Sequence, residues 1–394
     1  MKNLWNSDLA SNFTSDIEQR VYTSNLLGQS DRLVLHGGGN TSVKSTVDGD
    51  EILFVKGSGW DLVNIKAEGF APVNLNVLKN MAKLEFLSDS EMVRLQKDAM
   101  INKTAPNPSV EAILHAIIPY KFVDHTHADA VVTISNSKNG KYLIKKLFPN
   151  FLIIPYIMPG FILASKIYEL TKDFDWEKCE GIILHNHGIF TFDNDAKTSY
   201  DKMIKYVNQA EEFLDKEASL SILNINNNQK EFDVDILIKL ISIEKEFDIA
   251  YTINNSELAL SYSSLKVEKL TRGVLTPEHI IRTKRSPLYL IANDDLDDMK
   301  IALKKYIKEY VEYFDAYSTS ETMLNPAPNY IVVKDFGVIS VGKTQKEALI
   351  VNDVVSHTIE AVLRADMLGG YESISLKDSF DMEYWELEQA KLKK

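Results

Sequence analysis

The chain has 394 residues, of which 45% are hydrophobic and 25% are charged, as in an ordinary globular protein. Its net charge of −12, from 44 basic and 56 acidic residues, argues against a general nucleic-acid or anionic-membrane binder. The single cysteine excludes a disulfide framework and a cysteine-rich zinc module, so any metal site must depend on histidine and carboxylate. We expect two domains and, because no signal peptide or long apolar run is found, a cytoplasmic protein without nucleic-acid or membrane partners.

The first half of the chain alternates between helical and strand-like segments, as in a layered α/β domain. Apolar periodicity and the positions of glycine and proline predict its elements. In chain order we expect a helix at 12–28, strands within 32–44 and 51–63, a helix over 71–100, a helix from Val110 to Ile118 with Ser109 as N-cap, strands at 122–127 and 130–135, a helix at 138–147, a strand at 151–157, a helix at 161–170, two strand segments within 181–192 and a helix at 195–217.

A polar, asparagine-rich stretch separates the two halves of the chain and is typical of a domain boundary. We therefore predict an α/β domain at 1–220, a linker at 221–234 and a smaller C-terminal α+β region at 235–394. Within the C-terminal region the expected elements are helices at 295–313 and 344–367 and strands at 329–333 and 337–341.

Two histidines lie close together in the strand-like stretch FVDHTHADAVV. Side chains at positions i and i+2 of a strand point to the same face, so His125 and His127 project together. A third histidine, His187, lies in the turn of HNHG, where Gly188 lets the backbone come close. Three neutral imidazoles with one open position are typical of a catalytic zinc site, so we predict that these histidines bind Zn²⁺. His185 is the alternative to His187, and other divalent transition metals also suit such ligands.

A carboxylate near such a metal can act as general acid and base, and Glu111 is the candidate. It lies at the start of the predicted helix that directly precedes the His-x-His strand, so a short connection can bring it to the metal. A helix N-terminus stabilises a carboxylate as the anion, so the basicity of Glu111 would need tuning by burial or by the metal.

Two glycine-rich turns, HGGGNTSVK and VKGSGWD, provide candidate anion-binding groups. Successive backbone N–H groups in such turns can form an anion-binding concavity, and a helix N-terminus can add to it. Neither turn has the spacing of a dinucleotide fingerprint or a P-loop, so nucleotide binding is not expected. The candidate phosphate-binding residues are Gly38, Gly39, Asn40, Ser42, Gly57, Ser58, Gly59 and Ser109.

Each of these features also has a purely structural interpretation. A histidine in a half-buried strand is more often a packed core residue than a ligand, and a glycine-rich turn is often only a tight connection. Glu111 by itself could simply interact with a helix dipole. A basic cluster of Arg282, Lys284 and Arg285 is interpreted as a solvated surface, with a second anion contact as the alternative.

Over residues 15–220 the chain resembles the class II aldolase/adducin family. The resemblance is carried by five motifs that occur in this order: GGGNTSVK, VKGSGWDL, PSVEAILHA, VDHTHADAV and ILHNHGIFTF. The resemblance implies a three-layer α/β/α fold with a central, mainly antiparallel sheet, assembled as a homo-oligomer that is usually a tetramer. By position it also implies metal ligation by His125, His127 and His187 and acid–base catalysis by Glu111. The implied phosphate-binding positions are Gly39, Asn40, Ser42, Gly57, Ser58 and Ser109.

Three motifs in the second half of the chain make this resemblance more specific. They look like the aldolase portion of bifunctional rhamnulose-1-phosphate aldolase/short-chain dehydrogenase proteins, and they are RGVLTPEHIIRTKRSPLYL, APNYIVVKDFGVISVGKT and DMEYWELEQAKL. Because the sequence stops at Lys394, we expect the dehydrogenase to be missing. Those bifunctional proteins tend to carry Asp at the position of Glu111, whereas single-domain sugar-phosphate aldolases carry Glu.

The expected function is that of a metal-dependent aldolase, a lyase of carbohydrate metabolism. It would cleave a ketose 1-phosphate, such as a 6-deoxyketose 1-phosphate like rhamnulose 1-phosphate, to dihydroxyacetone phosphate and an aldehyde through a metal-stabilised enediolate. The alternatives on the same site are a pentulose-phosphate 4-epimerase and a sugar-phosphate dehydratase. A non-catalytic adducin-like scaffold is a further alternative, although such relatives lack the metal histidines. A nucleotide-dependent dehydrogenase would need a dinucleotide-binding turn that the sequence does not contain.

Overall fold

The computed structural model describes two compact units. None of the helices in the described parts of the chain combines the length and apolar character that a membrane span requires. Half of the predicted linker, residues 223–229, lies outside the described residues, and the predicted domain boundaries stay a prediction. The described residues are 1–222 and 230–387, of which 1–135 and 140–213 form the first unit and 136–139, 214–222 and 230–387 form the second.

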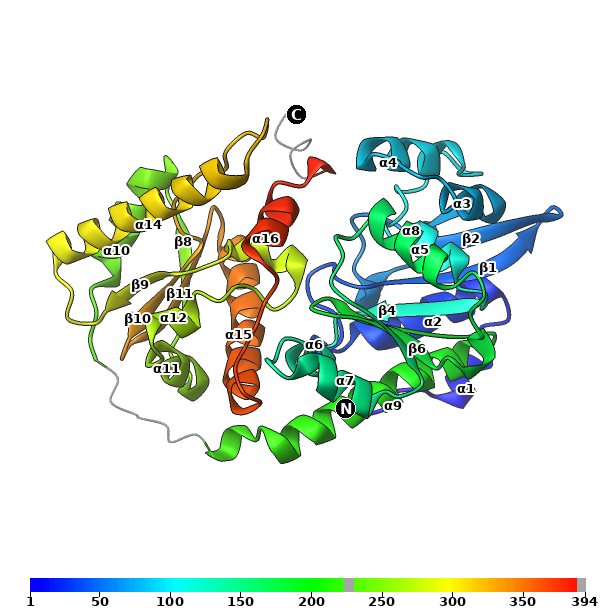
Figure 1. The fold of residues 1–394 in the computed structure, drawn as a ribbon, viewed down its shortest axis with the longest axis horizontal. Helices are drawn as coiled ribbons and strands as arrows, with labels where there is room; N and C mark the ends of the chain where they lie inside the picture. Colours follow the sequence, from blue (N-terminus) through cyan, green and yellow to red (C-terminus); the bar gives the residue numbers. More distant parts are fainter. Residues whose placement is uncertain (223–229, 388–394) are drawn as a thin grey trace. The chain divides into compact units, whose positions relative to one another are not determined.

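The first unit combines helices and strands (Figure 1). Helix α2 shows how the local sequence starts such an element: Ser15 and Glu18 form a capping box, which stabilises a helix start by about 1 kcal/mol. The elements of this unit, the last of which continues into the second, are α1 (Ser7–Ala10), α2 (Asp16–Gly28), β1 (Asn40–Val47), β2 (Asp50–Lys56), β3 (Phe70–Asn74), α3 (Leu75–Met81), α4 (Asp89–Asp98), α5 (Ala112–Ile117), β4 (Phe122–Thr126), α6 (Asp129–Ser135), α7 (Gly140–Leu147), β5 (Phe151–Ile154), α8 (Phe161–Leu170), β6 (Gly181–Leu184), β7 (Gly188–Asp193) and α9 (Ala196–Glu217).

Seven strands form one sheet in the order β3-β2-β1-β4-β7-β6-β5, and only the β5–β6 pair is parallel. Helices cover both faces. On one face, Ile17 of α2 and Ala196 of α9 pack with Val43 and Phe122 of the sheet. On the other face, α3, α5 and α8 pack on alternate residues such as Val123. The predicted three-layer α/β/α fold with a mainly antiparallel sheet is confirmed.

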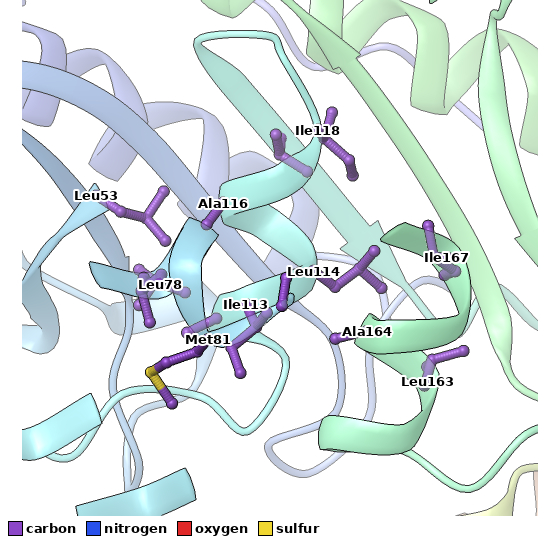
Figure 2. Close-up of a cluster of buried hydrophobic side chains, with 14 of the residues drawn as sticks. Leu53, Leu78, Met81, Ile113, Leu114, Ala116, Ile118, Leu163, Ala164 and Ile167 are labelled. Carbon is purple, nitrogen blue, oxygen red and sulfur yellow. The ribbon is translucent and has the colours of Figure 1, made fainter. Parts of the chain in front are cut away.

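Helix α5 begins directly after Glu111, a predicted site residue, and an apolar cluster holds the helix on the sheet (Figure 2). Each of the α3, α5 and α8 side chains in this cluster has an exposed fraction of at most 4%. Removing apolar surface from water is worth about 25 cal/mol per Å², so burial on two sides fixes the position of this short helix. The labelled residues of the three helices are Leu78, Met81, Ile113, Leu114, Ala116, Leu163, Ala164 and Ile167.

Three predicted elements are wrong. Residues 130–135 lie in helix α6 instead of a strand; all of them are buried, and periodicity cannot separate a short buried helix from a strand. Residues 70–74 form strand β3 instead of the start of a long helix, with Pro72 tolerated because β3 is an edge strand. Helix α5 begins at Ala112 with Glu111 at the N-cap position, so Ser109 is not its N-cap.

The second unit is the expected smaller α+β region. In its described residues, four strands form a sheet in the order β8 (Ala250–Asn254), β11 (Gly337–Gly342), β10 (Tyr330–Lys334) and β9 (Leu288–Ile291), and only β9 and β10 are parallel. Helices α10 and α14 pack on one face of this sheet, and α11, α12 and α15 pack on the other. Its principal elements are α10 (Val234–Lys245), β8 (Ala250–Asn254), α11 (Glu257–Ser263), α12 (Val267–Leu270), α13 (Ile280–Thr283), β9 (Leu288–Ile291), α14 (Leu296–Tyr317), β10 (Tyr330–Lys334), β11 (Gly337–Gly342), α15 (Gln345–Met367) and α16 (Leu376–Glu383).

The interpretation of the basic cluster as a solvated surface is wrong for two of its residues. Lys284 has an exposed fraction of only 4%, and its ammonium lies 3.6 Å from the ring centre of Tyr310. Arg285 donates hydrogen bonds to the carbonyl oxygens of Thr271 and Arg272. Both side chains therefore hold segments of the second unit together.

Candidate metal and acid–base site

Three histidines converge where strand β4 meets the turn between β6 and β7. His125 lies on β4, His127 follows the end of that strand, and His187 lies in the β6–β7 turn. One nitrogen from each ring lies within 4.8 Å of the others. The Nε2 atoms of His125 and His127 are 3.0 Å apart. The pairing of Thr126 with Ile189 in the β4–β7 ladder is what brings these distant segments together.

The contacts of His125 decide which of its nitrogens faces the other rings. Its Nδ1 lies 3.1 Å from the carbonyl oxygen of Ile189, which can only accept a hydrogen bond, so Nδ1 carries the proton. The lone pair is then on Nε2, the atom that faces His127. The ring is fully buried and stacks on Phe190 at a centroid distance of 4.0 Å. A backbone carbonyl in this role orients an imidazole for metal binding.

The turn that carries His187 depends on two special backbone positions. Asn186 has a φ of +59°, in the left-handed region that asparagine tolerates. A Cβ atom on Gly188 would lie 2.4 Å from the carbonyl oxygen of Thr126 and 2.9 Å from Cε1 of His125. Glycine is therefore required for the close approach. The other histidine of this motif, His185, extends the β5 pairing through its N–H and lies outside the converging group.

Glu111 lies beside the three rings with an exposed fraction of 4%. Its Oε2 is 3.5 Å from Nε2 of His125, and its Oε1 is 3.9 Å from Nε2 of His187. Oε2 also accepts a hydrogen bond of 2.7 Å from Nδ2 of Asn40. Oε1 is buried and has no hydrogen-bond partner within residues 1–222 and 230–387. One carboxylate oxygen is thus committed to the protein, and the other remains for a ligand.

A second layer of polar groups lies behind Asn40. Oδ1 of Asn40 is hydrogen-bonded to Nε2 of His115, and Nδ1 of His115 lies 2.7 Å from Oγ of Ser42. His115 and Ser42 are fully buried, so Ser42 lies behind the site surface and not at it. His115 was not among the predicted site residues. The signal that could have found it is its place one helical turn after Glu111 in PSVEAILHA.

The predicted phosphate turns lie on two segments. The turn after β2 pairs with the segment before α5: Ser58 donates its N–H to Asn107, and Ser109 donates its N–H to Lys56. These two amides are therefore used within the fold. Ser58 is an exposed residue and Ser109 is half-buried, and Oγ of Ser109 accepts a hydrogen bond of 3.3 Å from the N–H of Glu111.

The other turn places Gly39 against β4. Gly39 has a φ of +64°, and a Cβ there would lie 2.7 Å from the carbonyl oxygen of His125. This contact brings the glycine-rich turn directly beside the histidines, next to Asn40. The role of these residues in phosphate binding stays a prediction.

Lys56 was not among the predicted site residues, although it lies in the VKGSGWD motif. Its exposed fraction is 7%, and its Nζ donates a hydrogen bond of 3.2 Å to the carbonyl oxygen of Gly37. Burial lowers the pKa of Lys56, while the negative charges of Asp61 and Glu111 act in the opposite direction. The charge of Lys56 therefore acts on the carboxylate of Glu111. In the sequence, the position of Lys56 between a strand and the glycine turn of VKGSGWD could have indicated this residue.

The donor set can hold a metal ion. Three imidazoles supply nitrogen ligands of the kind that Zn²⁺ and neighbouring divalent ions accept, and the tautomer of His125 presents a lone pair to the group. The buried Oε1 of Glu111 provides a further oxygen beside them. The identity of the metal and the role of each ligand stay predictions.

Comparison with known families agrees with this fold. The family model for the class II aldolase and adducin N-terminal domain matches residues 18–214, and the model for the second domain of class II aldolases matches residues 230–392. The chain therefore belongs to the class II aldolase and adducin family, as its motifs had indicated.

Individual proteins and solved structures resemble this chain to different extents. The protein described as uncharacterized oxidoreductase YuxG of Bacillus subtilis (strain 168) is 30% identical over 419 residues, and the match covers 100% of this chain but 60% of that protein. The structure of the N-terminal class II aldolase domain of a conserved protein from Thermoplasma acidophilum is 40% identical, with a TM-score of 0.50 over 54% of this chain and 99% of that chain. L-fuculose-1-phosphate aldolase from Thermus thermophilus is a distant match, with 14% identity, coverage of 50% and 95%, and a TM-score of 0.34.

Proposed function

We propose that this protein is a divalent-metal-dependent aldolase that cleaves a ketose 1-phosphate to dihydroxyacetone phosphate and an aldehyde. A 6-deoxyketose 1-phosphate, such as rhamnulose 1-phosphate, is the substrate that the motifs of the second half favour. The observation that carries the proposal is the convergence of three imidazoles beside a buried carboxylate that has one uncommitted oxygen. Membership of the class II aldolase family supports it.

His125, His127 and His187 would hold the metal, with Zn²⁺ as the expected ion. When bound, the ion would supply Lewis-acid stabilisation of the negative charge that develops on the substrate oxygens. The protein's own contribution begins with orientation: the carbonyl of Ile189 and the ring of Phe190 hold His125 in one tautomer and one rotamer.

Glu111 would move the proton at the carbon that gains negative charge when the C–C bond breaks. A general base must lie within hydrogen-bonding reach of that proton, and Oε1 of Glu111 is the buried atom without a competing partner in the described residues. Proton transfer by a positioned side chain contributes about 10²- to 10⁴-fold to the rate.

The phosphate group would be bound by the hydroxyls of Ser58 and Ser109 and by the turn around Gly39 and Asn40. Lys56, which lies near Glu111, would add positive charge to this side of the site. Holding the phosphate fixes the sugar relative to the acid–base group, which is a substantial source of rate enhancement.

A panel of ketose 1-phosphates tests the proposal. The purified protein is loaded with Zn²⁺, Mn²⁺ or Co²⁺, and release of triose phosphate is followed with a coupled dehydrogenase. We expect release from at least one 6-deoxyketose 1-phosphate, and its loss with a chelator. An epimerase would instead invert a carbon of a pentulose phosphate without triose release, a dehydratase would release water, and a scaffold would bind no metal. Any of these three results overturns the proposal. The homotetramer and the cytoplasmic location stay predictions.

A further inference from the structure

The carboxylate of Glu111 is held by a chain of hydrogen bonds that runs through the polar side chains of Asn40, His115 and Ser42. Nδ2 of Asn40 contacts Oε2 of Glu111, Oδ1 of Asn40 contacts Nε2 of His115, and Nδ1 of His115 contacts Oγ of Ser42. The exposed fractions are 7% for Asn40 and 0% for His115 and Ser42.

The fold explains why these groups meet. Asn40 and Ser42 are two residues apart on β1, so they share the face of the sheet on which α5 packs. His115 is four residues after Glu111, so it lies on the same side of α5 one turn further along. The imidazole can therefore bridge the two β1 side chains while Glu111 reaches Asn40.

Each hydrogen bond in the chain has only one possible direction. Nδ2 of Asn40 faces Glu111 and can only donate, so Oε2 of Glu111 is the acceptor. The amide oxygen of Asn40 then faces His115 and can only accept, so Nε2 of His115 carries the proton. Burial lowers the pKa of His115 well below its usual value, so the ring is neutral. Its Nδ1 is therefore an acceptor, and the hydroxyl of Ser42 donates to it.

These hydrogen-bond directions give the two carboxylate oxygens of Glu111 different roles in proton transfer. A proton on Oε2 would point at an N–H of Asn40, which is itself a donor and is kept in place by His115. A proton on Oε1 meets no such donor within the described residues. We propose that Asn40, His115 and Ser42 form a positioning relay that keeps Oε2 of Glu111 as a hydrogen-bond acceptor, so that Oε1 takes the substrate proton and returns it.

The inference rests on the proposed aldolase function, whose acid–base step it makes specific. In the synthetic direction, Oε1 takes a proton from the carbon next to the carbonyl of dihydroxyacetone phosphate. The electron pair of that C–H bond stays with the substrate. The proton can exchange with solvent while it is on Oε1, and a proton returns from Oε1 when the carbon is reprotonated. In this arrangement Ser42 supports Asn40 and Glu111 and does not make its predicted contact with phosphate. The second N–H of Asn40 remains to bind a substrate oxygen.

Three variants of His115 separate positioning from packing. His115→Gln can place an N–H near the position of Nε2 and so keep the donor to Asn40. His115→Asn is too short to reach Asn40, and His115→Phe keeps an aromatic ring beside Phe190 without any donor. His185→Gln is the control for loss of a buried imidazole in the same unit.

We expect kcat to fall about 10- to 100-fold in His115→Phe and His115→Asn, the usual effect of removing an outer-shell partner. KM and the bound metal should stay near wild-type values, because the contacts of His115 are with Asn40, Ser42 and Phe190 and not with a metal ligand or the proposed phosphate-binding hydroxyls. His115→Gln should recover most of the kcat, and His185→Gln should match the wild type. Solvent exchange of the reactive proton of dihydroxyacetone phosphate should fall in parallel with kcat. Unchanged kcat in His115→Phe, or an equal loss in all three variants together with lower melting temperatures, would overturn the relay.

A second measurement is independent of activity. In the ¹⁵N spectrum of the histidine-labelled protein, the resonances absent from His115→Gln identify His115. We expect a neutral ring with its proton on Nε2, unchanged down to mildly acidic pH. A proton on Nδ1, or a charged ring, contradicts the relay whatever the protein catalyses. An inactive wild type with the expected tautomer would refute the aldolase proposal and leave the hydrogen-bond chain intact.

Discussion

Asn40 on β1 and His125 on β4 are paired residues of the antiparallel sheet, and this single pairing joins the two halves of the site. His125 belongs to the converging histidines, and Asn40 holds the carboxylate of Glu111. The metal group and the acid–base group are therefore built on adjacent, centrally placed strands, where neighbours on both sides limit their movement.

The two histidines of HNHG should differ completely in metal binding. His187→Ala removes one of the three converging nitrogens, so we expect tightly bound metal to fall from about one ion per chain to near zero. His127→Ala should behave in the same way. His185→Ala, two residues from His187 and equally buried, is the control and should keep its metal. Metal analysis after dialysis checks this, and stoichiometric metal in His187→Ala would contradict the ligand assignment.

Glu111→Gln should abolish most activity without loss of metal. The amide oxygen can replace Oε2 as acceptor from Asn40, which leaves an NH₂ group, unable to take a proton, at the position of Oε1. We expect kcat to fall about 10²- to 10⁴-fold, the range of a lost general base. Steady-state kinetics and metal analysis of the same preparation check this, and a variant with wild-type turnover is incompatible with the assignment.

Gly188→Ala should disrupt the metal site by steric overlap. The new Cβ would lie 2.4 Å from the carbonyl oxygen of Thr126 and 2.9 Å from Cε1 of His125, so the backbone of the turn must move. We expect loss of tight metal binding in a folded protein. Gly49→Ala is the control: no atom lies within 4 Å of its Cβ, and its φ of +92° costs only about 1–3 kcal/mol of backbone strain. Equal metal content in the two variants would show that Gly188 is not needed for the site.

The buried ion pair of Arg20 and Asp124 should stabilise the fold beneath the site. Their side chains are fully buried and 2.5 Å apart, and Asp124 directly precedes His125. Asp124→Asn leaves an uncompensated buried charge, so we expect the free energy of unfolding to fall by about 3–5 kcal/mol in urea denaturation. Asp98→Asn removes the partner of Arg94 in an exposed ion pair and should change the free energy of unfolding by less than about 0.5 kcal/mol. A similar small effect in both variants would contradict this role.

We expect the free energy of unfolding to rise with pH because of Lys44. Burial, and secondarily the charge of Lys79, lowers the pKa of Lys44 from 10.5 to about 7. Between these two values the unfolded chain binds a proton that the folded chain does not, so the free energy of unfolding increases with pH across this window. Urea denaturation at pH 7 and pH 9.5 should show a larger gain for the wild type than for Lys44→Met. An equal gain in both proteins would mean that Lys44 is not the titrating group.

Local rules of the sequence determined a large part of this protein. Strand alternation placed His125 and His127 on one face, and the motif order indicated the family and its layered fold. The same rules failed at residues 130–135, because a short segment that is buried all round has no polar face to reveal its period.

Only the tertiary structure decided how the separate motifs act on one another. Asn40 and Glu111 are 71 positions apart, and their contact exists because α5 packs on the face of the sheet that carries β1. The roles of Ser42 and His115 depend on the direction of hydrogen bonds between distant segments, and residue spacing along the chain holds no information on that direction. Spacing fixes which side chains share a face, whereas packing between elements fixes which partners those side chains meet.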